Sequence, residues 1–273
     1  MLAATLSAVA TTPALADTVT SSNWAGYAVH RPGTTFTNVA AAWTQPKVRC
    51  TLGQPTYSAV WVGLGGYNMS SDALEQIGSE ADCRASGKVD STVWYELVPA
   101  ASQPIRMQVR PGDRMFATVG VIGNKVTLSI TNETTHRAFK KTLRASLIDV
   151  SSAEWIVEAP SNCISDNSCV TLPLANFGST SFLAARAQTV AGHIGTISDA
   201  GWDASRIRLT SAGRRFIDNN GSTAVESLAT PSALTGNGSS FRVSYSTAPT
   251  GGNVFATARA STVRAGHLVH PGR

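Results

Sequence analysis

Two short segments hold the polar residues best placed to do chemistry. Gln76 lies in the run from Leu74 to Gly78, and Glu154 lies in the run from Ser152 to Val157. Both runs are otherwise mostly apolar and have the composition of strands. A strand interior tolerates such polar groups poorly unless they are paired or used. If both side chains face one cleft, a carboxylate and an amide can activate a water between them, which predicts a hydrolase.

Five of the seven glutamates lie in or beside the three most apolar, tryptophan-containing stretches: Glu75, Glu80, Glu96, Glu154 and Glu158. Because strand residues two or four apart share a face, Glu96 falls on the side of Trp94, and Glu158 on the side of Glu154. Gln76 and Glu80 likewise share a face. One such face would ordinarily point to solvent. Three together, each with a tryptophan nearby, favour a concave cleft surface.

Glycoside hydrolysis is one chemistry that paired acids on a β face support. The spacing of Glu154 and Glu158 is similar to the E-x-D-x-E strand of laminarinase-type glycosidases, with Ile156 at the middle position. Residues four apart in a strand are separated by roughly 13 Å, whereas the two carboxyls of such enzymes lie about 5–9.5 Å apart. A second acid from another strand would therefore be needed. A non-catalytic binding module on the same scaffold is a third alternative.

Motifs for several other chemistries do not occur in the sequence. There is no G-x-S-x-G, no H-E-x-x-H and no P-loop, and the five histidines are dispersed. A serine–histidine hydrolase and a histidine-based metal site therefore have little support. We expect neither a metal nor a cofactor.

Short motifs follow one another in a specific order between about residues 20 and 246. They are Ser22-Asn23-Trp24-Ala25-Gly26, residues 36–46, Trp61-Val62-Gly63-Leu64, residues 74–78, Trp94-Tyr95-Glu96, residues 153–158 and Leu174-Ala175-Asn176-Phe177-Gly178. In this order they resemble the glutamic peptidases, or eqolisins. The resemblance implies an endopeptidase that acts on polypeptides at acid pH with a dyad of Gln76 and Glu154. It also implies supporting or substrate-contacting roles for Trp61, Glu80, Trp94 and Glu96.

The chain departs from the fungal members of that family at two positions. Gly65 stands where they have an acid after the Trp-Val-Gly-x element, and Glu80 stands where they have aspartate. The first departure affects the hydrogen bonding of the cleft rather than the dyad. Glu158 is the rival for the second dyad position, and the resemblance, rather than strand geometry, favours Glu154.

The fold class predicted from the pattern is all-β. Apolar runs of five to nine residues are separated by Gly, Pro, Asn and Ser clusters, and residues 125–131 alternate with period two. Residues 180–190 fit one helical turn or a strand, and residues 230–240 read as a connector before a last strand. The spacing of the strands predicts a sandwich or a barrel in one domain, residues 17–248, and the fold we expect is a β-sandwich of lectin or glucanase type. The resemblance implies two antiparallel, seven-stranded sheets.

The ends of the chain and its composition indicate export. Residues 1–16 resemble a signal peptide without a basic start, and residues 249–273 read as an irregular tail. Charged residues make up only 14% of the chain, against about 25% in average soluble domains. The net charge of +5 is scattered, which argues against nucleic acid. No later stretch of 18 apolar residues occurs, so we expect a secreted monomer that does not span a membrane.

The four cysteines suggest disulfides in an exported chain. Cys163 and Cys169 bracket a short polar loop, so local pairing is expected, and this leaves Cys50 with Cys83. Zinc binding is far less favoured, because there is no C-x-x-C and no nearby histidine.

Overall fold

The computed structural model describes residues 16–68, 70–165, 168–210 and 227–246, and this part of the chain contains strands and no helix. The strands in chain order are β1 (Asp17–Ser21), β2 (Trp24–His30), β3 (Phe36–Thr44), β4 (Ala59–Gly65), β5 (Leu74–Cys83), β6 (Val89–Val98), β7 (Gln103–Ile105), β8 (Arg114–Ile122), β9 (Lys125–Asn132), β10 (Arg137–Arg144), β11 (Ser152–Glu158), β12 (Ser161–Ser165), β13 (Ser168–Thr171), β14 (Ser179–Thr189), β15 (Ile194–Gly195), β16 (Asp203–Thr210), β17 (Ser227–Pro231) and β18 (Phe241–Tyr245). The expected tail, and all but the last residue of the expected leader, lie outside the described residues.

One hydrogen-bonded sheet holds 16 of these strands, in the order β10-β9-β8-β3-β14-β18-β17-β16-β2-β11-β4-β5-β6-β7. β15 adds to β14, and β1 adds to β16 in the one parallel pairing of the described strands. β12 and β13 form a separate hairpin. The all-β class predicted from the sequence is confirmed.

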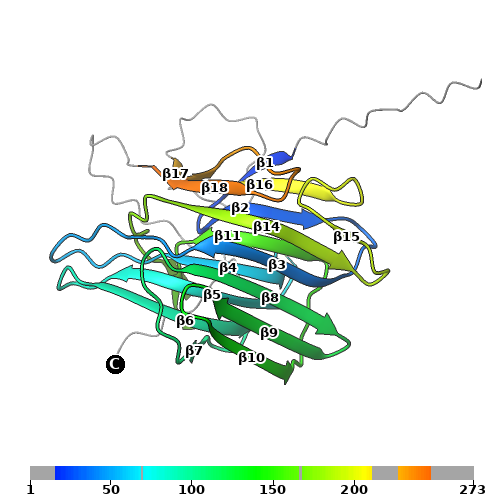
Figure 1. Ribbon diagram of the computed structural model, residues 1–273, viewed down its shortest axis with the longest axis horizontal. Coiled ribbons are helices and arrows are strands. Elements are labelled where there is room, and N and C mark those ends of the chain that lie inside the picture. The colour runs from blue at the N-terminus through cyan, green and yellow to red at the C-terminus, as the bar shows by residue number, and fades with distance from the viewer. Residues whose placement is uncertain (1–15, 69, 166–167, 211–226, 247–273) are drawn as a thin grey trace, which may run out of the picture.

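The sheet bends so that two layers face each other. β3 contacts β4 and β11, and β8 contacts β4 and β5, although none of these four pairs is hydrogen-bonded. Strands of both layers run in similar directions across the view in Figure 1, as in aligned sandwiches. β17 pairs with both β16 and β18 and so continues from one layer into the other. A division into two seven-stranded sheets therefore stays a prediction.

The core lies between the layers and is built on large apolar side chains. Trp43, Met115, Trp155 and Phe182 are all fully buried there. The Trp155 ring N–H donates a hydrogen bond of 3.0 Å to the carbonyl of Ala40 in the opposite layer, which satisfies its one polar atom.

Several local predictions can be compared with the structure. The alternating segment is β9, the segment that fitted a turn or a strand is β14, and the last strand is β18. The Cys50–Cys83 disulfide is present and links the segment before β4 to the end of β5. The backbones of Cys163 and Cys169 lie opposite each other in the β12–β13 hairpin, and their disulfide stays a prediction.

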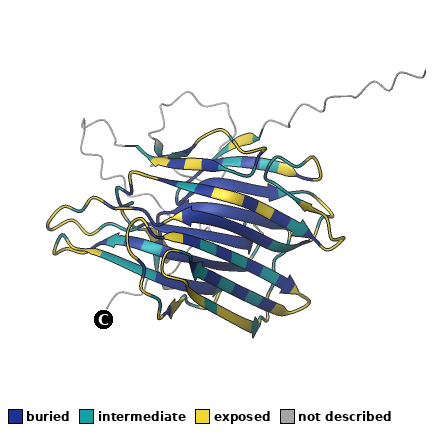
Figure 2. Cartoon of the chain, in the orientation of Figure 1, coloured by how far each residue is buried: buried dark blue, intermediate teal, exposed yellow. Residues whose placement is uncertain are grey.

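The two layers differ in how their strands are buried. β9 alternates between fully buried and half-buried residues, as expected of a strand with one face on the core. Every residue of β4 and β11 is buried, so these strands are covered on both faces. Figure 2 shows this contrast between uniformly buried strands and strands with alternating burial. The second buried face is where the candidate site lies.

Candidate active site

Register across four neighbouring strands brings the two predicted dyad residues onto one line. Glu154 of β11 lies opposite Gly63 of β4, Gly63 lies opposite Gln76 of β5, and Gln76 lies opposite Glu96 of β6. Residues directly opposite each other in a ladder point to the same face of the sheet. This face is the one turned away from Trp155 and the core, and we call these four residues the dyad row.

Two further rows on the same face contain the other predicted site residues. The tryptophan row consists of Ile156, Trp61, Gly78 and Trp94. The rim row consists of Glu158, Ala59, Glu80 and Thr92. The structure thus brings all six sequence-predicted site residues onto one face, together with the rival Glu158.

Gly63 separates the two dyad residues and has no side chain to fill the gap. Strands are spaced about 4.8 Å apart, so the backbones of Glu154 and Gln76 are roughly 10 Å apart. A Cβ on Gly63 would lie 2.9 Å from Cζ3 of Trp61 and 3.0 Å from Cδ1 of Leu74. The glycine therefore keeps room between a carboxyl and an amide while the tryptophan packs beside it. The sequence motif contained this glycine, but its spacing role was not predicted.

Gln76 is oriented by a neighbour in its own row. Its Nε2 donates a hydrogen bond of 2.7 Å to Oε2 of Glu96, and both side chains are fully buried. Since a carboxylate oxygen only accepts, this contact fixes which end of the amide faces Glu96. The second N–H of the amide is left for another partner. The amide oxygen Oε1 has no hydrogen-bond partner among the described residues.

Glu154 is fully buried, and neither of its carboxyl oxygens has a hydrogen-bond partner in the described part of the chain. Burial raises the pKa of Glu154 well above its ordinary value of 4.5. The hydroxyl of Ser152 lowers this pKa somewhat, although it is not aligned for a hydrogen bond. The carboxyl groups of Asp149 and Glu75 raise it further.

Glu158 is held differently, because both of its oxygens accept hydrogen bonds. The Trp61 ring N–H donates to Oε2 over 2.8 Å, and Nδ2 of Asn23 donates to Oε1 over 3.0 Å. Ser21 in turn donates to Oδ1 of Asn23 over 3.0 Å. Glu158 therefore fixes the Trp61 ring. Asn23 and Ser21 were not predicted as part of this network, although Asn23 belongs to the first motif of the resemblance.

Aromatic packing and one short contact complete the face. The rings of Trp24 and Trp61 meet edge to face with centroids 5.1 Å apart. Glu80 is half-buried and accepts a hydrogen bond of 2.6 Å from the Thr92 hydroxyl. The rim row is thus more open at Glu80 and Thr92, whereas its other members, Glu158 and Ala59, are as fully buried as the dyad row.

Within the described residues, no group of three or more His, Cys, Asp or Glu side chains is arranged to hold a metal ion. The same part of the chain contains no helix long and apolar enough to cross a membrane.

Fold and site together define an all-β protein with a buried carboxylate and a buried amide aligned on one face of a sandwich. Residues 22–214 match the Peptidase A4 family, and the chain belongs to this family of glutamic peptidases, or eqolisins. The chain is therefore an endopeptidase. No curated protein sequence matches it.

Solved structures of glutamic peptidases share the fold. Scytalido-glutamic peptidase, solved with a peptide-based transition-state analogue, has a TM-score of 0.65 and 22% identity over 82% of this chain and 98% of its own. SCP-B of the eqolisin family, in complex with the tripeptide Ala-Ile-His, has a TM-score of 0.62 and 21% identity over 82% and 98%. Aspergilloglutamic peptidase from Aspergillus niger has a TM-score of 0.52 and 25% identity over 70% and 99%.

Proposed function

We propose that the protein is a secreted acid endopeptidase in which Glu154 and Gln76 activate a water for attack on a peptide bond. The observation that carries this proposal is the dyad row, where a glycine separates a carboxyl from an amide on one face. Family membership supports polypeptides as substrates and favours this function over the glycosidase and binding-module alternatives.

The dyad residues have distinct roles in the proposed reaction. The Glu154 carboxylate takes a proton from a water, and the resulting hydroxide attacks the carbonyl carbon of the scissile bond. The free N–H of the Gln76 amide donates to the oxyanion, a contact typically worth about 2.7–4 kcal/mol. Glu154 then gives its proton to the leaving nitrogen as the carbon–nitrogen bond breaks. This sequence of steps uses neither a metal nor a covalent intermediate.

Register and hydrogen bonding support Glu154 over Glu158 as the base. Glu158 lies two rows away from Gln76, and both of its oxygens are occupied by Trp61 and Asn23. Glu154 lies in the row of Gln76, and its oxygens have no partner among the described residues. Of these two acids, Glu154 is therefore the better candidate to take a proton from a water held in that row.

The raised pKa of Glu154 bears on the working pH. A general base must be ionised in the free enzyme, so kcat/KM falls as the pH drops below its pKa. Since burial raises that pKa, the acidic limb of the profile should lie above the ordinary glutamate value of 4.5. We therefore propose activity in mildly rather than strongly acidic solution.

The test is proteolysis of denatured haemoglobin by the full chain across pH 2–8, beside Glu154→Ala and Gln76→Ala. Each variant should lose activity while its circular dichroism spectrum stays that of the wild type. Glu133→Gln is the matched control, because Glu133 lies far from the dyad row and pairs with Arg114. Full activity in either dyad variant would overturn the assignment.

The remaining expectations are proposals of the same kind. We propose two seven-stranded layers, one domain over residues 17–248, export, a monomeric state, and no binding to nucleic acid or membrane. Supporting or substrate-contacting roles for Trp61, Glu80, Trp94 and Glu96 are also proposed. Gel filtration and recovery from the culture medium of an expressing host test the monomer and the export.

A further inference from the structure

The segment before β11 brings an additional carboxylate to the edge of the candidate site. Asp149 lies in the connection between β10 and β11 and is half-buried. It fills the space beside Gly65 at the end of β4, since a Cβ on that glycine would lie 2.5 Å from Cβ of Asp149 and 2.9 Å from its Cγ. Gly65 also has a φ of +85°, a conformation that a side chain disfavours. An acid at position 65 could not coexist with Asp149 in this arrangement.

Each carboxylate oxygen of Asp149 accepts a hydrogen bond from a backbone N–H group. Gly66, just after β4, donates to Oδ2 over 3.0 Å, and Ser151, just before β11, donates to Oδ1 over 2.9 Å. β4 carries Gly63 and β11 carries Glu154, so one carboxylate links the ends of the two strands that set the dyad row. The carbonyl of neighbouring Val150 accepts from the Phe36 N–H over 2.8 Å, which ties this segment to β3.

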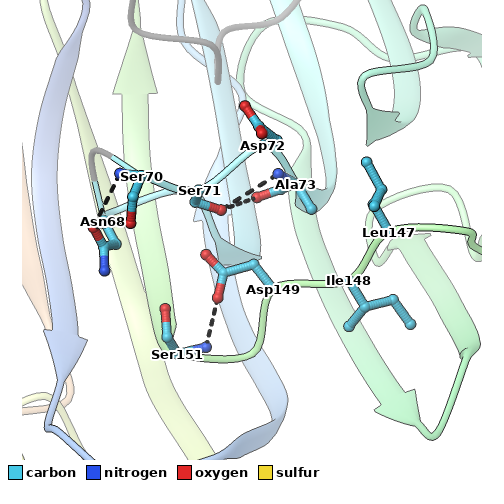
Figure 3. A pocket seen from close by; sticks show the side chains of 9 residues that line it. All are labelled: Asn68, Ser70, Ser71, Asp72, Ala73, Leu147, Ile148, Asp149 and Ser151. Carbon is cyan, nitrogen blue, oxygen red and sulfur yellow. Dashed lines mark hydrogen bonds between the residues drawn. The ribbon is translucent and has the colours of Figure 1, made fainter.

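The Asp149 side chain lies in the wall of a pocket of about 310 Å³ between the segments that lead into β5 and β11. Figure 3 shows the carboxylate between Ser71 and Ser151. Burial alone would raise the pKa of Asp149, but hydrogen bonds from Ser151 and Gly66, together with the nearby Ser71 hydroxyl, outweigh it and hold the pKa below its ordinary value. Asp149 therefore stays ionised to a lower pH than an ordinary aspartate does.

We propose that Asp149 is a positioning residue of the dyad, which joins the end of β4 to the start of β11 and supplies a fixed negative charge that acts on Glu154. The inference rests on the proposed role of Glu154 as the base.

Other titratable groups also surround Glu154, and they must be separated from the effect of Asp149. They are Glu75 of β5, Glu96 of β6, Glu158 of β11, and His30 at the end of β2 beside Asp203 at the start of β16. β4 contributes none. The variants below leave all of these groups in place.

The test compares Asp149→Asn, which keeps the shape and removes the charge, with Asp72→Asn, which removes a charge from an exposed residue of the same pocket. The first readout is the titration of the Glu154 carboxyl by carbon-13 NMR, with its signal assigned by its loss in Glu154→Gln. Removal of a nearby negative charge favours ionisation. The midpoint should fall by roughly half a pH unit or more in Asp149→Asn, and by clearly less in Asp72→Asn.

The second readout is the acidic limb of kcat/KM, which should move in the same direction in Asp149→Asn. An unchanged Glu154 midpoint in this variant overturns the proposal, whatever the activity. If the Glu154 midpoint shifts in Asp149→Asn but the wild type cleaves no peptide, the proposed function is overturned, while the effect of Asp149 on Glu154 stands. If Asp149→Asn does not fold, Asp149→Ser removes the same charge with a smaller side chain and gives the same comparison.

Discussion

β9 and β11 have the same period-two geometry but carry different residues on the face turned away from the core. On β9 that face holds Thr127 and Ser129, which are half-buried. On β11 it holds Glu154 and Glu158, which are fully buried. A strand normally exposes its charged side chains to water. Carboxyls on a buried outer face therefore single out the candidate site, whereas hydroxyls on a half-buried face are typical of an ordinary surface.

The comparison has one exception, which lies on the core side. Glu75 precedes Gln76 in β5 and so points toward the interior, where both of its oxygens lack a hydrogen-bond partner in the described part of the chain. Burial raises its pKa to about 9; the nearby backbone N–H groups of Asp149 and Glu75, not aligned for hydrogen bonds, oppose this shift, and the charge of Asp149 adds to it. A buried acid is thus not sufficient to define the site, since Gln76 and not Glu75 shares a row with Glu154.

The largest expected effect distinguishes the outer faces of β11 and β9. Glu154→Gln removes the proposed base with almost no change of shape and should lower kcat/KM by roughly 10²–10⁴-fold. Ser129→Ala, at an outward position of β9, should leave kcat/KM within a few-fold of the wild type. Steady-state kinetics on one peptide substrate measures both. Equal effects would show that the buried acid face has no special role.

On the inner face, Trp155→Ala should destabilise the fold by about 3–5 kcal/mol, as expected when a buried aromatic residue is truncated. It also leaves the Ala40 carbonyl without its 3.0 Å donor. Ile122→Ala, at a residue that is 82% exposed, should change stability by about 0.5 kcal/mol or less. Urea unfolding at the pH of maximal stability measures both, and a small loss in Trp155→Ala would contradict the assignment of this face to the core.

The charge state of Glu75 predicts how stability depends on pH. Its folded pKa of about 9 exceeds the ordinary 4.5, so the folded state binds more protons than the unfolded state between these values. The contribution of Glu75 to the free energy of unfolding is therefore fully present below about pH 4.5. It is lost as the pH rises toward 9, and the loss is about 3 kcal/mol at pH 7. Glu75→Gln removes this dependence.

The measurement is the difference in unfolding free energy between wild type and Glu75→Gln at pH 4 and at pH 7. Relative to the wild type, the variant should gain stability between the two values, because other titrating groups cancel in the difference. A constant difference would mean that Glu75 is not a buried neutral acid.

The smallest expected effect lies in the rim row. Thr92→Val removes the 2.6 Å hydrogen bond to Glu80 without changing the shape of the side chain. We expect a loss of about 0.5–1.5 kcal/mol in stability and a rise in KM of a few-fold with kcat retained. Thr127→Val, on the outer face of β9, is the control and should alter neither kinetic constant.

Much of the site could be predicted from the sequence because it depends on strand periodicity. Gln76 and Glu80 share a face, and so do Trp94 and Glu96, as period two requires. Which strands are neighbours could not be predicted in this way. The role of Gly63 follows from register across three strands, and that of Asp149 from the path of a connecting segment. The hydrogen bond that Asn23 donates to Glu158 likewise follows from the position of Asn23 just before β2.

The position of β11 in the sheet has a consequence for folding. β11 pairs with β2 on one side and β4 on the other, although it follows both by a long stretch of chain. Contacts between distant parts of a chain form slowly, because loop closure costs entropy before the contacts form. During synthesis, Glu154 cannot align with Gln76 until β11 has paired with β2 and β4, which are made earlier. The proposed dyad can therefore form only after β11, which ends at Glu158, has been synthesised.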